Sequence, residues 1–215
     1  MSVTGVWVVG ALPDEALRDL PRAAVQGLTS ASLSTCEDVS GELAWWESRA
    51  QESMFRKSAT SRGSWRAKED AFRLRAFLDA CRDDSEEMEA LRDAVMDRFP
   101  PHGEEGLFAA VARKACPFSA LAYALGPDAV RRLPGRAGDF LLDAEQVRTR
   151  LPAVEETLDL TGARRRAAVE RIHAWMTGLG DDPHHDADEL LDGPLRVLRH
   201  AAGTGRAVAA QVRWY

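Results

Sequence analysis

The sequence has few cysteines and no apolar run of the roughly 18 residues that a membrane-spanning helix needs. Its three cysteines, Cys36, Cys81 and Cys116, lie far apart and form no C-x-x-C pair. A disulfide framework and a zinc ribbon are therefore not expected. The apolar start of the chain has no basic residues before it and Pro13 follows closely, so we expect a strand there and not a signal peptide. These features predict a cytoplasmic protein, and the Ala- and Arg-rich, Lys-poor usage suggests a GC-rich bacterial genome.

Glycine-rich phosphate loops and nucleophile signatures are missing as well. Neither G-x-x-x-x-G-K-[ST] nor G-x-G-x-x-G occurs, so ATP, GTP and dinucleotide chemistry have no support in the sequence. The chain also lacks a G-x-S-x-G elbow and any cysteine-enzyme signature. The net charge of −6 argues against nucleic acid as the main partner, because phosphate binding needs a basic face. An enzymatic role stays open, but the sequence favours a protein that works without catalysis or a cofactor.

What the sequence does contain is an ordinary globular composition with both helix and strand signals. The chain of 215 residues is 45% hydrophobic and 29% charged, which predicts one domain, residues 1–215, with a core of its own. Apolar runs predict strands at 3–9 and 140–142, and alternation predicts a third at 207–215. We expect an α+β fold that is predominantly helical, with a small sheet built from the N-terminal, a central and the C-terminal strand. A helical elaboration is expected over roughly 35–115.

Capping residues predict where several helices begin. A capping box at Ser34 and Glu37 predicts a helix that continues to about Lys57. Ser64 and Ser85 are expected to cap the next two helices. Each of these two carries an apolar stripe at spacings of three and four, made of Ala71, Leu74, Phe77, Leu78 and Cys81 in the first and of Met88, Leu91, Val95 and Phe99 in the second.

The second half of the chain has further start and stop signals. Short helical signals alternate with breakers over 104–132. Asp143 with Gln146 forms another capping box, and Pro152 is expected to break the helix that starts there. Gly193-Pro194 is expected to interrupt the last helix.

Five carboxylates and two imidazoles lie within ten residues, 180–189. One interpretation is a divalent metal site, used by a metal-dependent hydrolase or a small-ligand binder. The candidate ligands are His184, His185, Asp186 and Asp182. No H-x-x-x-H pair places two imidazoles on one face of a helix. The other interpretation is a turn followed by a helix start, with Asp186 and Glu189 as a capping box.

The segment Arg49–Lys68 is basic in an otherwise acidic protein. It holds six basic residues against the single acid Glu52, with aromatic residues beside and within it. The candidate binding residues are Trp45, Trp46, Arg56, Arg62, Trp65 and Arg66. A solvated loop with its tryptophans in the core is the alternative. Asp79–Asp97 has the opposite charge, with eight acids against two bases, and could neutralise the basic segment within the fold or between subunits.

Three segments carry a family resemblance. The opening strand Met1–Gly5 is followed by Pro13–Leu17, Phe140–Val147 is a short strand leading into a capped helix, and Leu195–Ala202 precedes the closing strand Gly205–Val208. Together they resemble the YfbM-like family of uncharacterised bacterial proteins. The resemblance implies an α+β fold and no particular activity. Where that family tends to show Ala-Trp-His in a central helix, this chain has Ala71-Phe72-Arg73.

The leading functional hypothesis is a non-catalytic domain that binds an unknown protein partner through the basic, aromatic segment, because Trp and Arg dominate the energetics of interfaces. The alternative is that the protein is a metal-dependent hydrolase or a small-ligand binder that uses the segment His184–Glu189. Phosphate or RNA binding through residues 49–68 is third.

Overall fold

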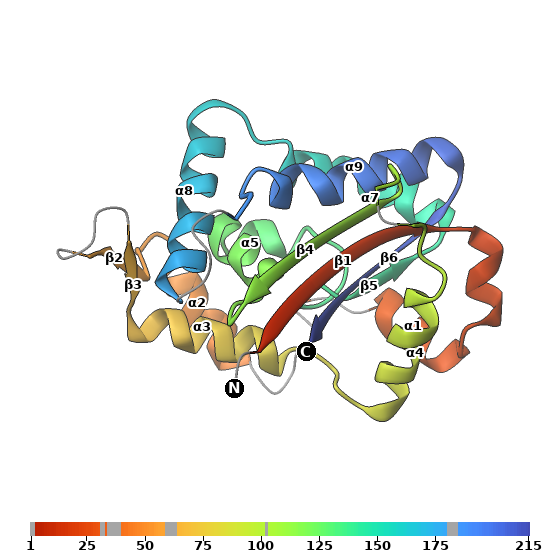
Figure 1. Ribbon diagram of the computed structural model, residues 1–215, viewed down its shortest axis with the longest axis horizontal. Helices are drawn as coiled ribbons and strands as arrows, with labels where there is room; N and C mark the ends of the chain where they lie inside the picture. Colours follow the sequence, from red (N-terminus) through yellow and green to blue (C-terminus); the bar gives the residue numbers. More distant parts are fainter. Residues whose placement is uncertain (1–2, 31–32, 34–39, 59–63, 102, 180–184) are drawn as a thin grey trace.

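A four-stranded antiparallel sheet lies at the centre of the protein (Figure 1). The computed structural model describes residues 3–30, 33, 40–58, 64–101, 103–179 and 185–215. The strands in spatial order are β4 (Leu107–Arg113), β1 (Thr4–Leu12), β6 (Ala207–Trp214) and β5 (Phe140–Leu142). The fold is α+β and mostly helical, and its sheet contains the N-terminal, central and C-terminal strands that the sequence predicts.

The two central strands come from the two ends of the chain. β1 pairs with β6 from Gly5 opposite Trp214 to Leu12 opposite Ala207. Beyond the paired strands, Thr4 and Tyr215 exchange two backbone hydrogen bonds of 2.9 Å each. The predicted pairing of the terminal strands is therefore confirmed. Residues 207–212 are buried on both faces of the sheet, because helices cover both sides of β6.

Helices form a layer on each face of the sheet. One face is covered by α5 (Pro117–Leu125), α7 (Ala144–Leu158) and α9 (Glu189–Thr204), and α8 (Gly162–Gly178) packs outside α5. The other face is covered by α1 (Arg22–Ser30) and α4 (Glu86–Met96) near β5 (Figure 1). The remaining helices are η1 (Asp14–Asp19), α2 (Ser40–Ser48), α3 (Glu69–Ala80) and α6 (Pro127–Val130). Among the described residues, none of these helices is long and apolar enough to cross a membrane.

Several of the observed helices follow from local signals in the sequence, namely their capping residues and apolar stripes. Ser85 caps α4 by accepting a hydrogen bond from the Met88 N–H at 3.3 Å. Both hydrogen bonds of the Asp143–Gln146 capping box are present at the start of α7. The two predicted apolar stripes are buried except for Phe99, which is half-buried.

The predicted helix to Lys57 and the predicted cap at Ser64 are wrong. α2 ends at Ser48, and the chain then forms a hairpin from β2 (Phe55–Lys57) and β3 (Trp65–Ala67). The next helix begins only at Glu69, without a side-chain cap. The strands arise because Phe55 packs against a distant helix, a tertiary contact that local propensity does not reveal.

The two predicted helix breaks are also wrong, and one strand was missed. α7 continues from Ala144 to Leu158 through Pro152, which lies at an exposed position of the helix. α9 continues through Gly193-Pro194, and Gly193 is needed there because a Cβ would lie 2.1 Å from the Phe108 ring. Phe108 belongs to β4, the strand that the sequence did not predict within the range 104–132.

Candidate functional site

The β2–β3 hairpin stands at one end of the molecule, beside α8 (Figure 1). In its register Phe55 lies opposite Ala67, Arg56 opposite Arg66 and Lys57 opposite Trp65. The side chains of a strand alternate between its two faces. One face of the hairpin therefore carries Phe55, Lys57, Trp65 and Ala67, and the other carries Arg56 and Arg66.

The inner face of the hairpin is held against α8 by a close approach. A Cβ on Gly178 would lie 2.4 Å from a Phe55 ring carbon, so only glycine lets the ring approach the helix this closely. Phe55 also makes edge contacts with Tyr123 and Trp175, at centroid distances of 5.3 and 5.8 Å. The Met54 N–H donates to the Tyr123 hydroxyl at 3.2 Å, which fixes the start of β2 to α5. The hairpin is thus a positioned element of the fold.

The outer face of the hairpin carries two arginines side by side. Arg56 and Arg66 are directly opposite each other, and both side chains are exposed. Neither forms an ion pair with any residue that the structure describes. Like charges that face each other across two strands destabilise the pairing, typically by several tenths of a kcal/mol. An anion placed between the two guanidinium groups would remove this repulsion.

The other predicted binding residues have different surroundings. The prediction that Trp46 binds a partner is wrong, because its side chain is fully buried against Phe77 and cannot touch a partner. Trp45 is half-buried, with the Arg73 guanidinium 4.2 Å from its ring. Trp65 is half-buried, with the Lys57 ammonium group 5.3 Å from its ring. Arg62 lies outside the described residues.

A pocket of about 300 Å³ lies between the hairpin, the preceding loop and α8. Its lining includes Trp65 from the predicted binding set, together with Tyr123 of α5 and Arg171 of α8. The Arg171 guanidinium lies 4.4 Å from the centre of the Tyr123 ring. No pattern in the sequence points to Tyr123 or Arg171, because both belong to helices remote in sequence from the basic segment.

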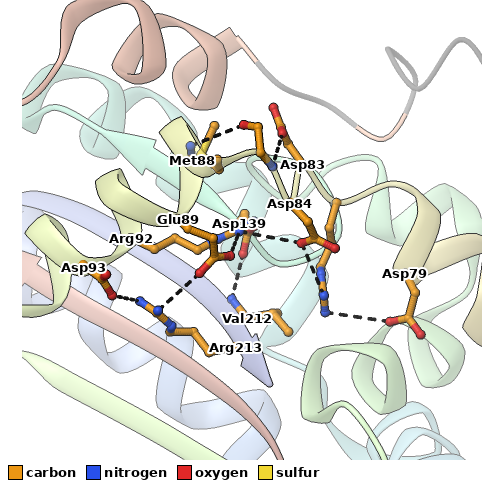
Figure 2. Close-up of polar contacts among 12 residues, drawn as sticks. Asp79, Asp83, Asp84, Met88, Glu89, Arg92, Asp93, Asp139, Val212 and Arg213 are labelled. Atoms are coloured by element: carbon orange, nitrogen blue, oxygen red, sulfur yellow. Dashed lines mark hydrogen bonds and ion pairs between the residues drawn. The ribbon is translucent and has the colours of Figure 1, made fainter. Parts of the chain in front are cut away.

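Among the described residues, no carboxylate of the acidic segment Asp79–Asp97 forms an ion pair with the hairpin. Figure 2 shows its carboxylates converging on arginines nearby. Glu89 and Asp93 pair with Arg213 of β6, at 3.2 and 2.7 Å. The same segment places Arg92, which is 3% exposed, in an ion pair with the equally buried Asp139.

The Arg92–Asp139 pair has little room beside it for a ligand. Asp139 also accepts a 2.7 Å hydrogen bond from the Val212 N–H, so its carboxylate links α4 to the central sheet (Figure 2). Burial raises the pKa of the Asp139 carboxyl, and the Arg92 guanidinium opposes that rise. The adjoining cavity is about 10 Å³, roughly the space of one water molecule. The pair therefore acts as a structural link.

The acidic histidine segment is described only in part. His184 and Asp182 lie outside the described residues, and His185 is half-buried. Asp186 accepts a 3.0 Å hydrogen bond from the Glu189 N–H, which is one of the two bonds of the predicted capping box. The predicted helix start is wrong by two residues, because the N-cap of α9 is Asp188, which forms no side-chain capping bond. In the described part of the chain no three His, Cys, Asp or Glu side chains come together as a metal site. The metal interpretation stays a prediction.

The two cysteines that the structure describes are buried. Cys81 is 1% exposed and belongs to the core stripe of α3. Burial raises the pKa of the Cys116 thiol, although Ser119 donates hydrogen bonds that act in the other direction. A buried, protonated thiol is a poor nucleophile. Cys36 lies outside the described residues.

Comparison of the chain with protein-family models, with curated proteins and with solved structures finds no match. The resemblance to the YfbM-like family therefore stays a prediction.

Proposed function

We propose that this protein is a non-catalytic binding domain, and that the outer face of the β2–β3 hairpin recognises an acidic segment of a protein partner. The observation that carries the proposal is the facing pair Arg56 and Arg66, which no described carboxylate neutralises. Arginine is well suited to this role, because its planar guanidinium binds a carboxylate through two parallel hydrogen bonds.

The position of the hairpin supports the same proposal. Phe55 fixes the strands to α8 and α5. The backbone that carries the two guanidinium groups is therefore already held in place before a partner binds. A site that is already ordered loses less conformational entropy when a partner binds. Trp65 on the inner face adds half-exposed aromatic surface at the same end of the molecule.

Protein carboxylates are a better match for this face than nucleic acid. The whole chain carries a net charge of −6, so a long polyphosphate that extends past the hairpin is repelled by the rest of the protein. A short acidic segment needs only the local positive charge. Binding should weaken as salt is added, because the contact is exposed and therefore screened.

The experiment measures binding of a fluorescent ten-residue Asp/Glu peptide by polarisation. The double variant Arg56→Ser, Arg66→Ser should bind this peptide at least tenfold more weakly than the wild type. The matched control is Arg148→Ser, Arg150→Ser, which removes the same number of exposed arginines from α7. This control should bind like the wild type.

Two results would contradict the proposal. One is equal loss of peptide binding in the hairpin and control variants, which would indicate nonspecific charge attraction. The other is tighter binding of single-stranded RNA than of the acidic peptide at the same salt concentration, which would favour the phosphate or RNA alternative.

A further inference from the structure

The pocket behind the hairpin contains an arginine whose charge is not balanced by the protein. Arg171 is half-buried, and no described carboxylate oxygen lies within ion-pair distance of it. Its terminal nitrogens donate to the Ala50 carbonyl oxygen over long distances of 3.4 and 3.5 Å. Its Nε is buried and has no hydrogen-bond partner. A buried guanidinium in this condition lacks the charged hydrogen bonds that usually compensate its burial.

The carboxylates beside this arginine are engaged elsewhere. Glu170 pairs with Lys57 at 3.6 Å, and Glu52 pairs with Arg49 at 2.8 Å. Both basic partners lie outside the pocket lining, and Arg171 is the one basic residue among the described residues that line the pocket. Burial lowers the pKa of Arg171, and the Tyr123 side chain acts in the other direction. An arginine nevertheless stays protonated at neutral pH.

The remaining lining of the pocket is aromatic and small. Trp65 contributes half-exposed ring surface, and Ala167 and Ala174 of α8 add only small side chains. Tyr123 is fully buried, with the Arg171 guanidinium over its ring. The volume of about 300 Å³ is at the lower end of the range for small-molecule sites. The space therefore fits a compact ligand with one flat apolar part.

We infer that this pocket binds a small aromatic monocarboxylate. The carboxylate pairs with the Arg171 guanidinium, and the ring lies against the half-exposed Trp65 side chain. A carboxylate brings the one negative charge that this guanidinium can pair with, whereas a phosphate dianion would bring a second negative charge next to Glu52 and Glu170. This site is on the inner side of the hairpin and does not depend on Arg56 or Arg66.

The experiment titrates benzoate into the full chain by calorimetry, with benzamide as the neutral probe of similar shape and phenyl phosphate as the dianion. Benzoate should bind saturably, and at least tenfold more tightly than either of the other probes. Arg171→Met, which keeps side-chain length but removes the charge, should weaken benzoate binding at least tenfold. Arg148→Met on α7 is the matched control and should bind benzoate like the wild type.

A second variant separates loss of the ligand from loss of the fold. Ala167→Phe fills the pocket from an exposed position on α8 and leaves Arg171 in place. It should abolish benzoate binding while its thermal unfolding midpoint stays close to that of the wild type. The Arg56→Ser, Arg66→Ser variant should still bind benzoate, so the two proposals can fail separately.

The inference is overturned by any of three results. These are the absence of saturable benzoate binding to the wild type, equal affinity of the wild type and Arg171→Met, and tighter binding of phenyl phosphate than of benzoate.

Discussion

A single glycine sets how closely the hairpin can lie against the rest of the molecule. Gly178 is half-buried at the end of α8, and the space that a side chain would take there is filled by the Phe55 ring. Gly203, near the end of α9, has nothing within 4 Å of the position its Cβ would occupy. The two residues are alike in chemistry and differ in their surroundings, which makes them a matched pair.

We predict opposite effects of alanine at these two positions. Gly178→Ala should destabilise the protein by about 1–3 kcal/mol, because the ring must move away from the added methyl group. Gly203→Ala should stabilise it by about 0.5–1 kcal/mol, because alanine lowers the entropy lost when the helix forms. Urea unfolding followed by circular dichroism gives both values. Equal stability of Gly178→Ala and the wild type would mean that the hairpin is not held by this contact.

At the scale of elements, α8 and α9 are joined by one arginine and two carboxylates. Arg165 on α8 donates from Nε to Asp188 at 2.7 Å and from its two terminal nitrogens to Asp192 at 2.8 and 2.7 Å. The hydrogen bonds from Arg165 lower the pKa of the Asp192 carboxyl below its usual value. Half of the Asp192 side chain is exposed, so solvent screens the interaction.

The contribution of this ion pair to stability should depend on pH. Because the folded-state pKa of Asp192 lies below the unfolded value of about 3.9, the stabilisation is complete above that pH and is lost as the pH falls through the folded value. Asp192→Asn should therefore cost up to about 1 kcal/mol at pH 7 and clearly less at pH 3. The measurement is urea unfolding at both pH values. In an Arg165→Met background, Asp192→Asn should have little effect at pH 7, and an undiminished effect would assign the loss to another contact.

The elements that the sequence predicts correctly are those with local causes. The apolar residues of β1 and the reciprocal hydrogen bonds of the Asp143–Gln146 capping box depend on neighbours within a few positions. The hairpin was missed because each strand has three residues and Phe55 is held by Gly178, more than 100 positions away in the sequence. For the same reason the sequence predicted Trp65 as a binding residue but did not find Arg171, which tertiary structure alone brings to the same pocket.

At the scale of the whole molecule, the ends of the described chain meet at one edge of the fold (Figure 1). Thr4 and Tyr215 are hydrogen-bonded to each other, so a short linker can join residue 215 to residue 3, the first that the structure describes. New ends can be opened at Thr161-Gly162, which is exposed between α7 and α8. Circular permutation succeeds most often at exposed connections of this kind.

We predict that this circular permutant folds and that a chain ending at Arg206 does not. The permutant keeps every strand of the sheet, whereas the truncated chain lacks β6, the strand that connects β1 to β5. Near-UV circular dichroism should give a native-like spectrum for the permutant and none for the truncated chain. A cooperative thermal transition in the truncated chain would show that β6 is dispensable.

The pairing of β1 with β6 also bears on how the protein forms in the cell. The ribosome makes β1 some 200 residues before it makes β6, its neighbour on one side. At about 5–20 residues per second, synthesis of the intervening chain takes roughly 10–40 s. Throughout this time the apolar strand β1 lacks its central partner and exposes backbone hydrogen-bonding groups. The nascent chain should therefore depend on chaperones until residues 207–214 have left the ribosome, and its native sheet should form only after that point.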